Sequence, residues 1–144
     1  MTVQRHRRRG CQTSLGDVAA ALVDEQVALD ELVGGLTEDR WALPTPSAGW
    51  SIADSLGHLA HFDGAAASAI TDTAEFGGSL GTPLRQGGDL ESITLHRDLG
   101  PDELLATWCR GREVLTAAAA SLEDGTRVPW YGPSMGARSF LTAG

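Results

Sequence analysis

The chain has 144 residues and a mass of 15.1 kDa, which is enough for one domain with a packed core. Nineteen acidic residues outnumber eleven basic ones, and the net charge of −8 argues against a nucleic-acid partner, since binding one requires neutralising its phosphates. No apolar run approaches the roughly 20 residues of a membrane span, so no membrane partner is expected and we predict a cytoplasmic protein. Few β-branched or aromatic clusters occur, so a sheet is not expected.

The first twelve residues form an arginine-rich head. We expect residues 1–12 to be a disordered tail and residues 13–144 to form one helical bundle domain. The two cysteines, Cys11 and Cys109, have neither a CxxC partner nor the spacing of a structural zinc site, so we expect free thiols.

The first helix is predicted to start after Ser14, as N-cap, and to fray at Gly34 and Gly35. Glu25 falls on its apolar stripe and either tilts to solvent or points into a polar pocket in the bundle. The positions predicted to face inward are Leu15, Val18, Leu22, Leu29, Leu32, Val33 and Leu36.

A stiff Pro/Gly loop, residues 44–50, leads into the second helix, predicted over 52–72. Ser51 and Asp54 have the spacing of a capping box. On a helical wheel His58 lies at the edge of the apolar face, and Asp63 lies near its middle, where an unpaired carboxylate would be costly. The face itself consists of Ile52, Leu56, Leu59, Phe62, Ala66, Ala69 and Ile70.

Residues 73–100 read as a loose, glycine-punctuated crossover with a short helix at 90–96. A third helix is predicted from Pro101 to about residues 123–125. A stiff aromatic corner, residues 128–133, follows, and Ser134 is predicted to cap a fourth helix that starts at Met135. The predicted fold class is therefore all-α, a four-helix bundle with a long crossover and a truncated fourth helix.

No GxSxG, HExxH, P-loop or dinucleotide-binding motif is present. His58 and His61 are three residues apart, so both imidazoles can point to one side of a helix and bind zinc, copper, iron or nickel. The alternative is that they are ordinary edge residues of an amphipathic helix. Outside the tail, the remaining histidine is His96 in the crossover.

Two segments carry a family resemblance. Residues 44–52, PTPSAGWSI, followed by His58-Leu59-Ala60, resemble the N-terminal domain of mycothiol-dependent maleylpyruvate isomerases in the DinB-like superfamily. Residues 128–133, VPWYGP, resemble the segment that leads into the last bundle helix of a metal-binding branch of that group. The resemblance covers most of residues 14–144.

The resemblance implies a divalent metal, typically zinc, held by one histidine on helix two and by a carboxylate and a histidine on helix four. The first ligand maps onto His58, and the other two would lie just beyond residues 140–144. The resemblance assigns no ligand role to His61 or Asp63. Either could support the site from outside, since ligating histidines usually hydrogen-bond an oxygen acceptor.

The function implied is that of a mycothiol-dependent maleylpyruvate isomerase or thiol S-transferase, in which the metal activates a thiol that attacks an electrophile. The expected partners are a small-molecule electrophile or thiol, with mycothiol as cosubstrate. The chain would be an incomplete member that lacks the helix-four ligands. The alternative is a non-catalytic helical binding or interaction module whose open groove favours a homodimer.

Overall fold

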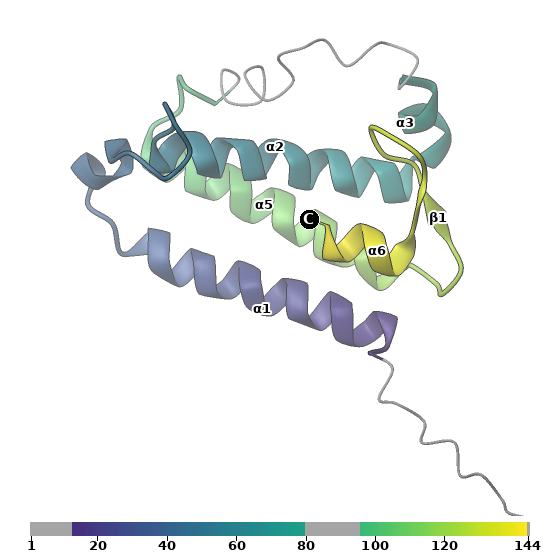
Figure 1. Ribbon diagram of the computed structural model, residues 1–144. Helices are drawn as coiled ribbons and strands as arrows, with labels where there is room; N and C mark the ends of the chain where they lie inside the picture. The colour runs from purple at the N-terminus through teal and green to yellow at the C-terminus, as the bar shows by residue number, and fades with distance from the viewer. Residues whose placement is uncertain (1–12, 80–95, 144) are drawn as a thin grey trace, which may run out of the picture.

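The computed structural model describes residues 13–79 and 96–143, without the side chains of 77–79 (Figure 1). The predicted tail at 1–12 and most of the helix predicted at 90–96 lie outside the described residues. The described chain is mostly helical, which confirms the predicted all-α class. Its three long helices, each of 20 residues, are α1 (Leu15–Gly34), α2 (Ile52–Thr71) and α5 (Pro101–Ala120). The shorter elements are η1 (Glu38–Ala42), α3 (Thr73–Ser79), β1 (Arg127–Val128), β2 (Met135–Gly136) and α6 (Ala137–Thr142).

The three long helices lie side by side, and α6 lies beside α1 at one end (Figure 1). Helices α2 and α5 run in the same direction, whereas α1 runs opposite to both (Figure 1). The α2–α5 contact is the most extensive between any two of the described elements. None of the helices that the structure describes combines the length and the apolar character needed to cross a bilayer.

The starts of α1 and α2 are both fixed by capping boxes. At α2 the Asp54 amide donates to Ser51 Oγ at 3.1 Å, and the Ser51 amide donates to Asp54 Oδ2 at 3.0 Å. Ser14 and Asp17 make the same reciprocal pair at α1, with distances of 3.1 and 3.0 Å. The predicted starts of both helices are confirmed, because each depends on two residues three apart in the sequence.

The loop before α2 is closed by its own backbone. Pro44 and Ser51 form an antiparallel bridge, and the Thr45 amide donates to the Trp50 carbonyl at 2.9 Å. Gly49 turns the chain with a φ of 80°, a conformation that favours glycine. The loop therefore delivers Trp50 to the start of α2, where its ring lies 5.0 Å from that of His58.

Three elements of the structure depart from the sequence prediction. Residues 73–79 form helix α3 instead of loose chain, and Phe76 of this helix stacks on Trp130 at 5.8 Å. Helix α5 ends at Ala120, before the predicted 123–125. The Ser121 and Leu122 amides donate hydrogen bonds to the carbonyls three residues earlier, which closes the last turn. In the first connection, residues 38–42 form the 3-10 helix η1, which buries Trp41.

The prediction for the last helix was wrong at its start. Arg127 and Val128 pair with Gly136 and Met135 in a small antiparallel hairpin, although no sheet was expected. Ser134 lies in this hairpin, where its Oγ accepts a hydrogen bond from Arg127 Nε at 3.2 Å, so it does not cap α6. Helix α6 starts at Ala137 after Gly136, which has no side chain to cap with.

The apolar face predicted for α1 is also partly wrong. Leu15 and Val33 are buried, but Leu32 is 69% exposed. Glu25 is exposed, which confirms the first of its two alternatives, and Gln26 takes the buried position beside it.

Beside a small cluster of Ala67, Leu115 and Ala118, two larger apolar clusters form the core. One, at the η1 end of the bundle, contains Val33, Trp41, Leu56, Ala60, Leu104 and Trp108. The other, at the hairpin end, contains Leu15, Ala69, Ala119, Val128, Ala137, Phe140 and Leu141. Helix α2 contributes to both clusters, and the stretch between Ala60 and Ala69 carries Phe62 and Asp63.

Candidate functional site

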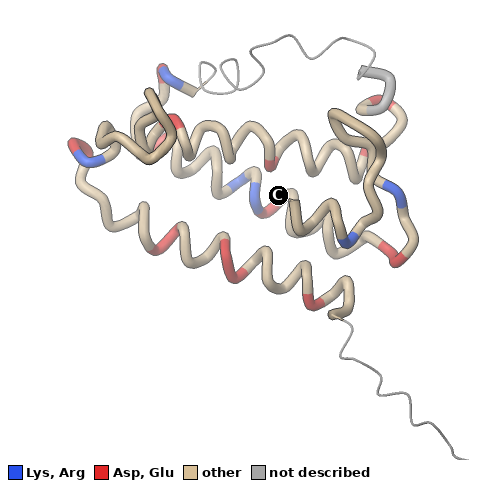
Figure 2. The backbone as a smooth tube through the Cα atoms, viewed as in Figure 1, with Lys and Arg blue, Asp and Glu red and all other residues tan. Residues whose placement is uncertain are grey.

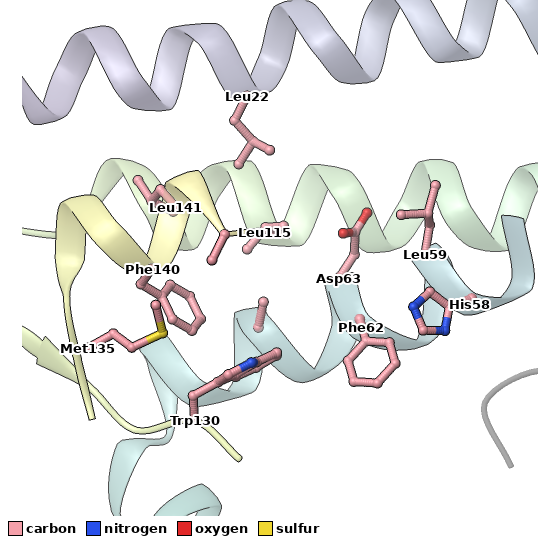
Figure 3. A pocket seen from close by; sticks show the side chains of 12 residues that line it. Leu22, His58, Leu59, Phe62, Asp63, Leu115, Trp130, Met135, Phe140 and Leu141 are labelled. Carbon is pink, nitrogen blue, oxygen red and sulfur yellow. The ribbon is translucent and has the colours of Figure 1, made fainter. Parts of the chain in front are cut away.

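A pocket of about 290 Å³ opens beside the hairpin-end cluster, which supplies most of its apolar lining (Figure 3). Helix α2 forms one wall, and α1, α5, the hairpin and α6 supply the others. Most of the lining is apolar, and two of its members, His58 and Asp63, can carry charge. The lining residues are Leu22, His58, Leu59, Phe62, Asp63, Ala66, Leu115, Trp130, Met135, Phe140, Leu141 and Ala143.

The His58 imidazole lies at the edge of this pocket, between two aromatic rings. Its centroid is 5.0 Å from that of Trp50 and 4.6 Å from that of Phe62. The prediction from the helical wheel, that His58 lies at the border of the inward face of α2, agrees with this position (Figure 3). The two flanking rings restrict how the imidazole can turn.

Asp63 faces the same pocket from one turn further along α2. Its Oδ2 accepts a hydrogen bond at 3.1 Å from Nε1 of Trp108, a residue that is 1% exposed. Burial raises the pKa of the Asp63 carboxyl to about 6, against the Trp108 hydrogen bond and the positive charge of Arg112, which both lower it. Asp63 can therefore gain or lose a proton near neutral pH.

Arg112 supports Trp108 from the side of α1. Its guanidinium lies 4.7 Å from the centroid of the Trp108 ring, within the range of a cation–π contact. The same group donates to the Gln26 carbonyl at 2.8 Å and pairs with the Asp30 carboxylate. In Figure 2 the arginine positions of α5 are blue and lie near the middle of the helix, and the acidic positions along α1 are red. A series of contacts thus connects α1, through Arg112 and Trp108 of α5, to Asp63 in the pocket.

Aromatic rings form another part of the pocket wall. The Trp130 ring lies 6.2 Å from that of Phe62 and meets the Phe140 ring edge-on at 5.2 Å. Phe76 stacks on Trp130, and Tyr131 packs edge-on against Phe76 at 5.7 Å. The stiff corner predicted at residues 128–133 is therefore the part of the chain that closes one side of the pocket.

In the described ranges, no group of three His, Cys, Asp or Glu side chains is placed to hold a metal ion. The His61 ring contacts Phe62 edge-on at 5.1 Å, and His96 packs against Gly57 on α2 instead of joining His58 in the pocket. The hydrogen bond that the structure shows to Asp63 comes from Trp108.

Sequence reasoning missed the roles of Trp108 and Arg112. Neither residue was singled out from the sequence as part of the site. Their spacing of four residues on one helix is compatible with a ring-to-guanidinium contact and could have suggested the pair. Their connection to Asp63 spans 45 positions in the sequence and has no local signal.

Comparison with known proteins gives three findings. The family described as the mycothiol maleylpyruvate isomerase N-terminal domain matches residues 16–144. Two uncharacterized proteins of Mycobacterium tuberculosis, from two strains, are each 37% identical over 130 residues, which cover 89% of this chain and 51% of the relative. The crystal structure of a His-to-Ala mutant of mycothiol-dependent maleylpyruvate isomerase matches with a TM-score of 0.70 at 15% identity, over 89% of this chain and 55% of that chain. The chain thus spans about half the length of these relatives.

Proposed function

Because the chain belongs to the mycothiol maleylpyruvate isomerase N-terminal domain family, with its DinB-like fold, we propose that its pocket binds a small thiol or the electrophile that a thiol attacks. The chain would serve as the ligand-binding domain of a mycothiol-dependent isomerase or thiol S-transferase. The observation that carries this proposal is the pocket of about 290 Å³, which has aromatic walls and two ionisable side chains. Concave, mostly apolar sites with a few polar groups are typical of small-molecule binding.

The protein's own residues supply an apolar surface and two polar contacts for such a site. Phe62 and Trp130 present apolar surface that excludes water from a bound sulfur or carbon chain. His58 and Asp63 supply polar contacts at separate points of the wall, so a ligand that reaches both is held in one orientation.

We further propose that His58 provides one ligand of a divalent metal, zinc above all. The resemblance of the segment around His58 to the isomerase family supports this role. The other donors would have to come from outside the described residues, which lack a three-donor group. In such a site the metal would lower the pKa of a bound thiol.

The thiol proposal is tested by calorimetric titration of the protein with mycothiol. We expect saturable binding, with Phe62→Ala weakening it at least about tenfold because a wall of the pocket is removed. Leu32→Ala, on the exposed side of α1, is the control and should bind as the unmodified protein does. Equal affinity of the two variants would contradict the assignment of this pocket.

The metal proposal is tested by zinc titration of the full chain. Stoichiometric zinc binding that is lost in His58→Ala and kept in His61→Ala supports the metal proposal. His61→Ala is a matched control, because it removes the same type of side chain from the same helix. Binding that survives in His58→Ala would overturn the assignment of His58. No binding of zinc or of mycothiol would instead favour a non-catalytic helical interaction module, and sedimentation of the protein would then test for a homodimer.

A further inference from the structure

Asp63 is an unusual residue for its position. Helix α2 has two charged residues, Asp54 in its capping box and Asp63 at its centre, and no arginine or lysine. Asp54 is held at the helix start by Ser51. Asp63 lies instead between the two apolar clusters, where an ionised carboxylate loses much of its hydration. A carboxylate at such a cost to stability is expected to have a role beyond packing.

One oxygen of the Asp63 carboxylate is held in place by a hydrogen bond. Trp108 Nε1 donates to Oδ2, and among the described residues no other hydrogen bond to this carboxylate is made. Trp108 is fully buried in the core, and Arg112 packs on its ring while being anchored to α1. Oδ2 is thus fixed by the protein, and Oδ1 is the oxygen through which the carboxylate can meet a ligand.

The charges around the pocket favour a particular ligand. Arg112 of α5 is the cation that acts on Asp63, and it is shared with Asp30 of α1. No arginine is among the residues that line the pocket, where His58 is the other ionisable group. A carboxylate ligand would meet the negative charge of Asp63 with no arginine in the wall to offset it. A neutral group with an acidic hydrogen would instead gain a charge-assisted hydrogen bond.

We propose that Asp63 determines the specificity of the pocket by accepting a hydrogen bond from a neutral donor such as a thiol S–H, and that Trp108 and Arg112 are positioning residues that keep its carboxylate ionised. The choice of a thiol rests on the proposed function. The positioning of Asp63 by Trp108 and Arg112 does not depend on the proposed function, and it can be measured without any ligand.

The first test is nuclear magnetic resonance of the ligand-free, nitrogen-15-labelled protein. The indole N–H of Trp108, assigned with Trp108→Phe, reports the charge of the carboxylate to which it donates. We expect its signal to titrate with a midpoint near pH 6, and Asp63→Asn to abolish this titration. Arg112→Met should raise the midpoint by about one pH unit because a nearby positive charge is removed.

Two variants control this measurement. Arg112→Lys keeps a positive charge and should restore most of the original midpoint. Arg110→Met removes an exposed arginine from the same helix and should leave the midpoint unchanged. A wild-type midpoint above about pH 7.5, which would leave the carboxyl protonated at neutral pH, or equal midpoints for Arg112→Met and Arg110→Met, would overturn the positioning role.

The second test compares mycothiol with its S-methyl derivative, which lacks the S–H donor. We expect the wild-type protein to prefer the thiol by about tenfold at pH 7.5 and to lose the preference at pH 5, where Asp63 is protonated. Asp63→Asn should show no such pH dependence. Equal binding of the two compounds at both pH values overturns the specificity role. Failure of both compounds to bind overturns the proposed function, while the ligand-free titration still decides the roles of Trp108 and Arg112.

Discussion

At the scale of single residues, Asp63 links the pocket to the stability of the protein. Its pKa in the folded state is about 6, above the ordinary value of 3.8, because burial disfavours the charged form. Between these two pH values the folded protein holds a proton that the unfolded chain has released. The contribution of Asp63 to stability therefore falls as the pH rises through this window, and it stays low above pH 6.

We predict that Asp63→Asn stabilises the protein at neutral pH. Asparagine is neutral and its side-chain oxygen can still accept the Trp108 hydrogen bond, so the variant should gain about 1–3 kcal/mol in the free energy of unfolding at pH 7.5. Near pH 4 the two proteins should be almost equal. Urea unfolding at both pH values measures the difference, and a gain that is the same at pH 4 and pH 7.5 would contradict the titration of Asp63.

At the scale of the elements, helix α2 has two internal glycines with different surroundings. A Cβ added at Gly57 would lie 3.1 Å from Cβ of His96, whereas one added at Gly64 would meet no atom within 4 Å. Gly57 is thus needed for the close approach of the 96–99 segment to α2, next to His58. Gly64 is exposed and has no such constraint.

We predict that alanine at these two glycines has opposite effects. Gly64→Ala should stabilise the protein by about 0.5–1 kcal/mol, since alanine lowers the conformational entropy lost on forming a helix. Gly57→Ala gains the same propensity but displaces His96, and we expect it to be less stable than the original protein. Thermal unfolding of both variants measures the two changes in stability. Equal stabilisation by the two would contradict the prediction, because it would show that His96 can move away from a Cβ at position 57 without loss of stability.

The elements also show which features a sequence can predict. The caps at Ser14 and Ser51 were predicted because each needs only a partner three residues away. Ser134 was assigned a similar role and instead binds Arg127, because the hairpin competes for the same side chain. Helix α3 was missed because Phe76 gains its packing from Trp130, which is far away in the sequence.

The same distinction holds for the site. The position of His58 on the helical face could be predicted from periodicity, and so could the cost of a carboxylate at Asp63. What could not be predicted was the identity of the group that meets Asp63, because Trp108 reaches it across the α2–α5 contact. The roles of His58 and His61 toward a metal remain predictions.

At the scale of the whole molecule, Arg112 connects α1 to α5, which packs against α2. Its side chain is 17% exposed and binds the Gln26 carbonyl and the Asp30 carboxylate, both on α1. Hydrogen bonds of this charged kind contribute about 1.5–3 kcal/mol when they are well shielded. Loss of these contacts should therefore loosen α1 more than the rest of the bundle.

We predict that Arg112→Met accelerates amide hydrogen exchange in the middle of α1 by about tenfold, the factor that about 1.4 kcal/mol produces. Exchange in the middle of α2 should change less, because its packing on α5 is kept. Arg110→Met, which removes an exposed arginine of α5, should leave both helices unchanged. Uniform acceleration in all three long helices would instead indicate a loss of global stability.

The contact between Trp50 and His58 gives the protein an optical reporter. Indole emission depends on what touches the ring, and the Trp50 ring lies 5.0 Å from the imidazole that borders the pocket. A molecule that reorients this imidazole on entry should change the brightness or colour of Trp50 fluorescence. The part of the emission that is lost in Trp50→Phe would identify this signal, and occupancy could then be followed without labelling the chain.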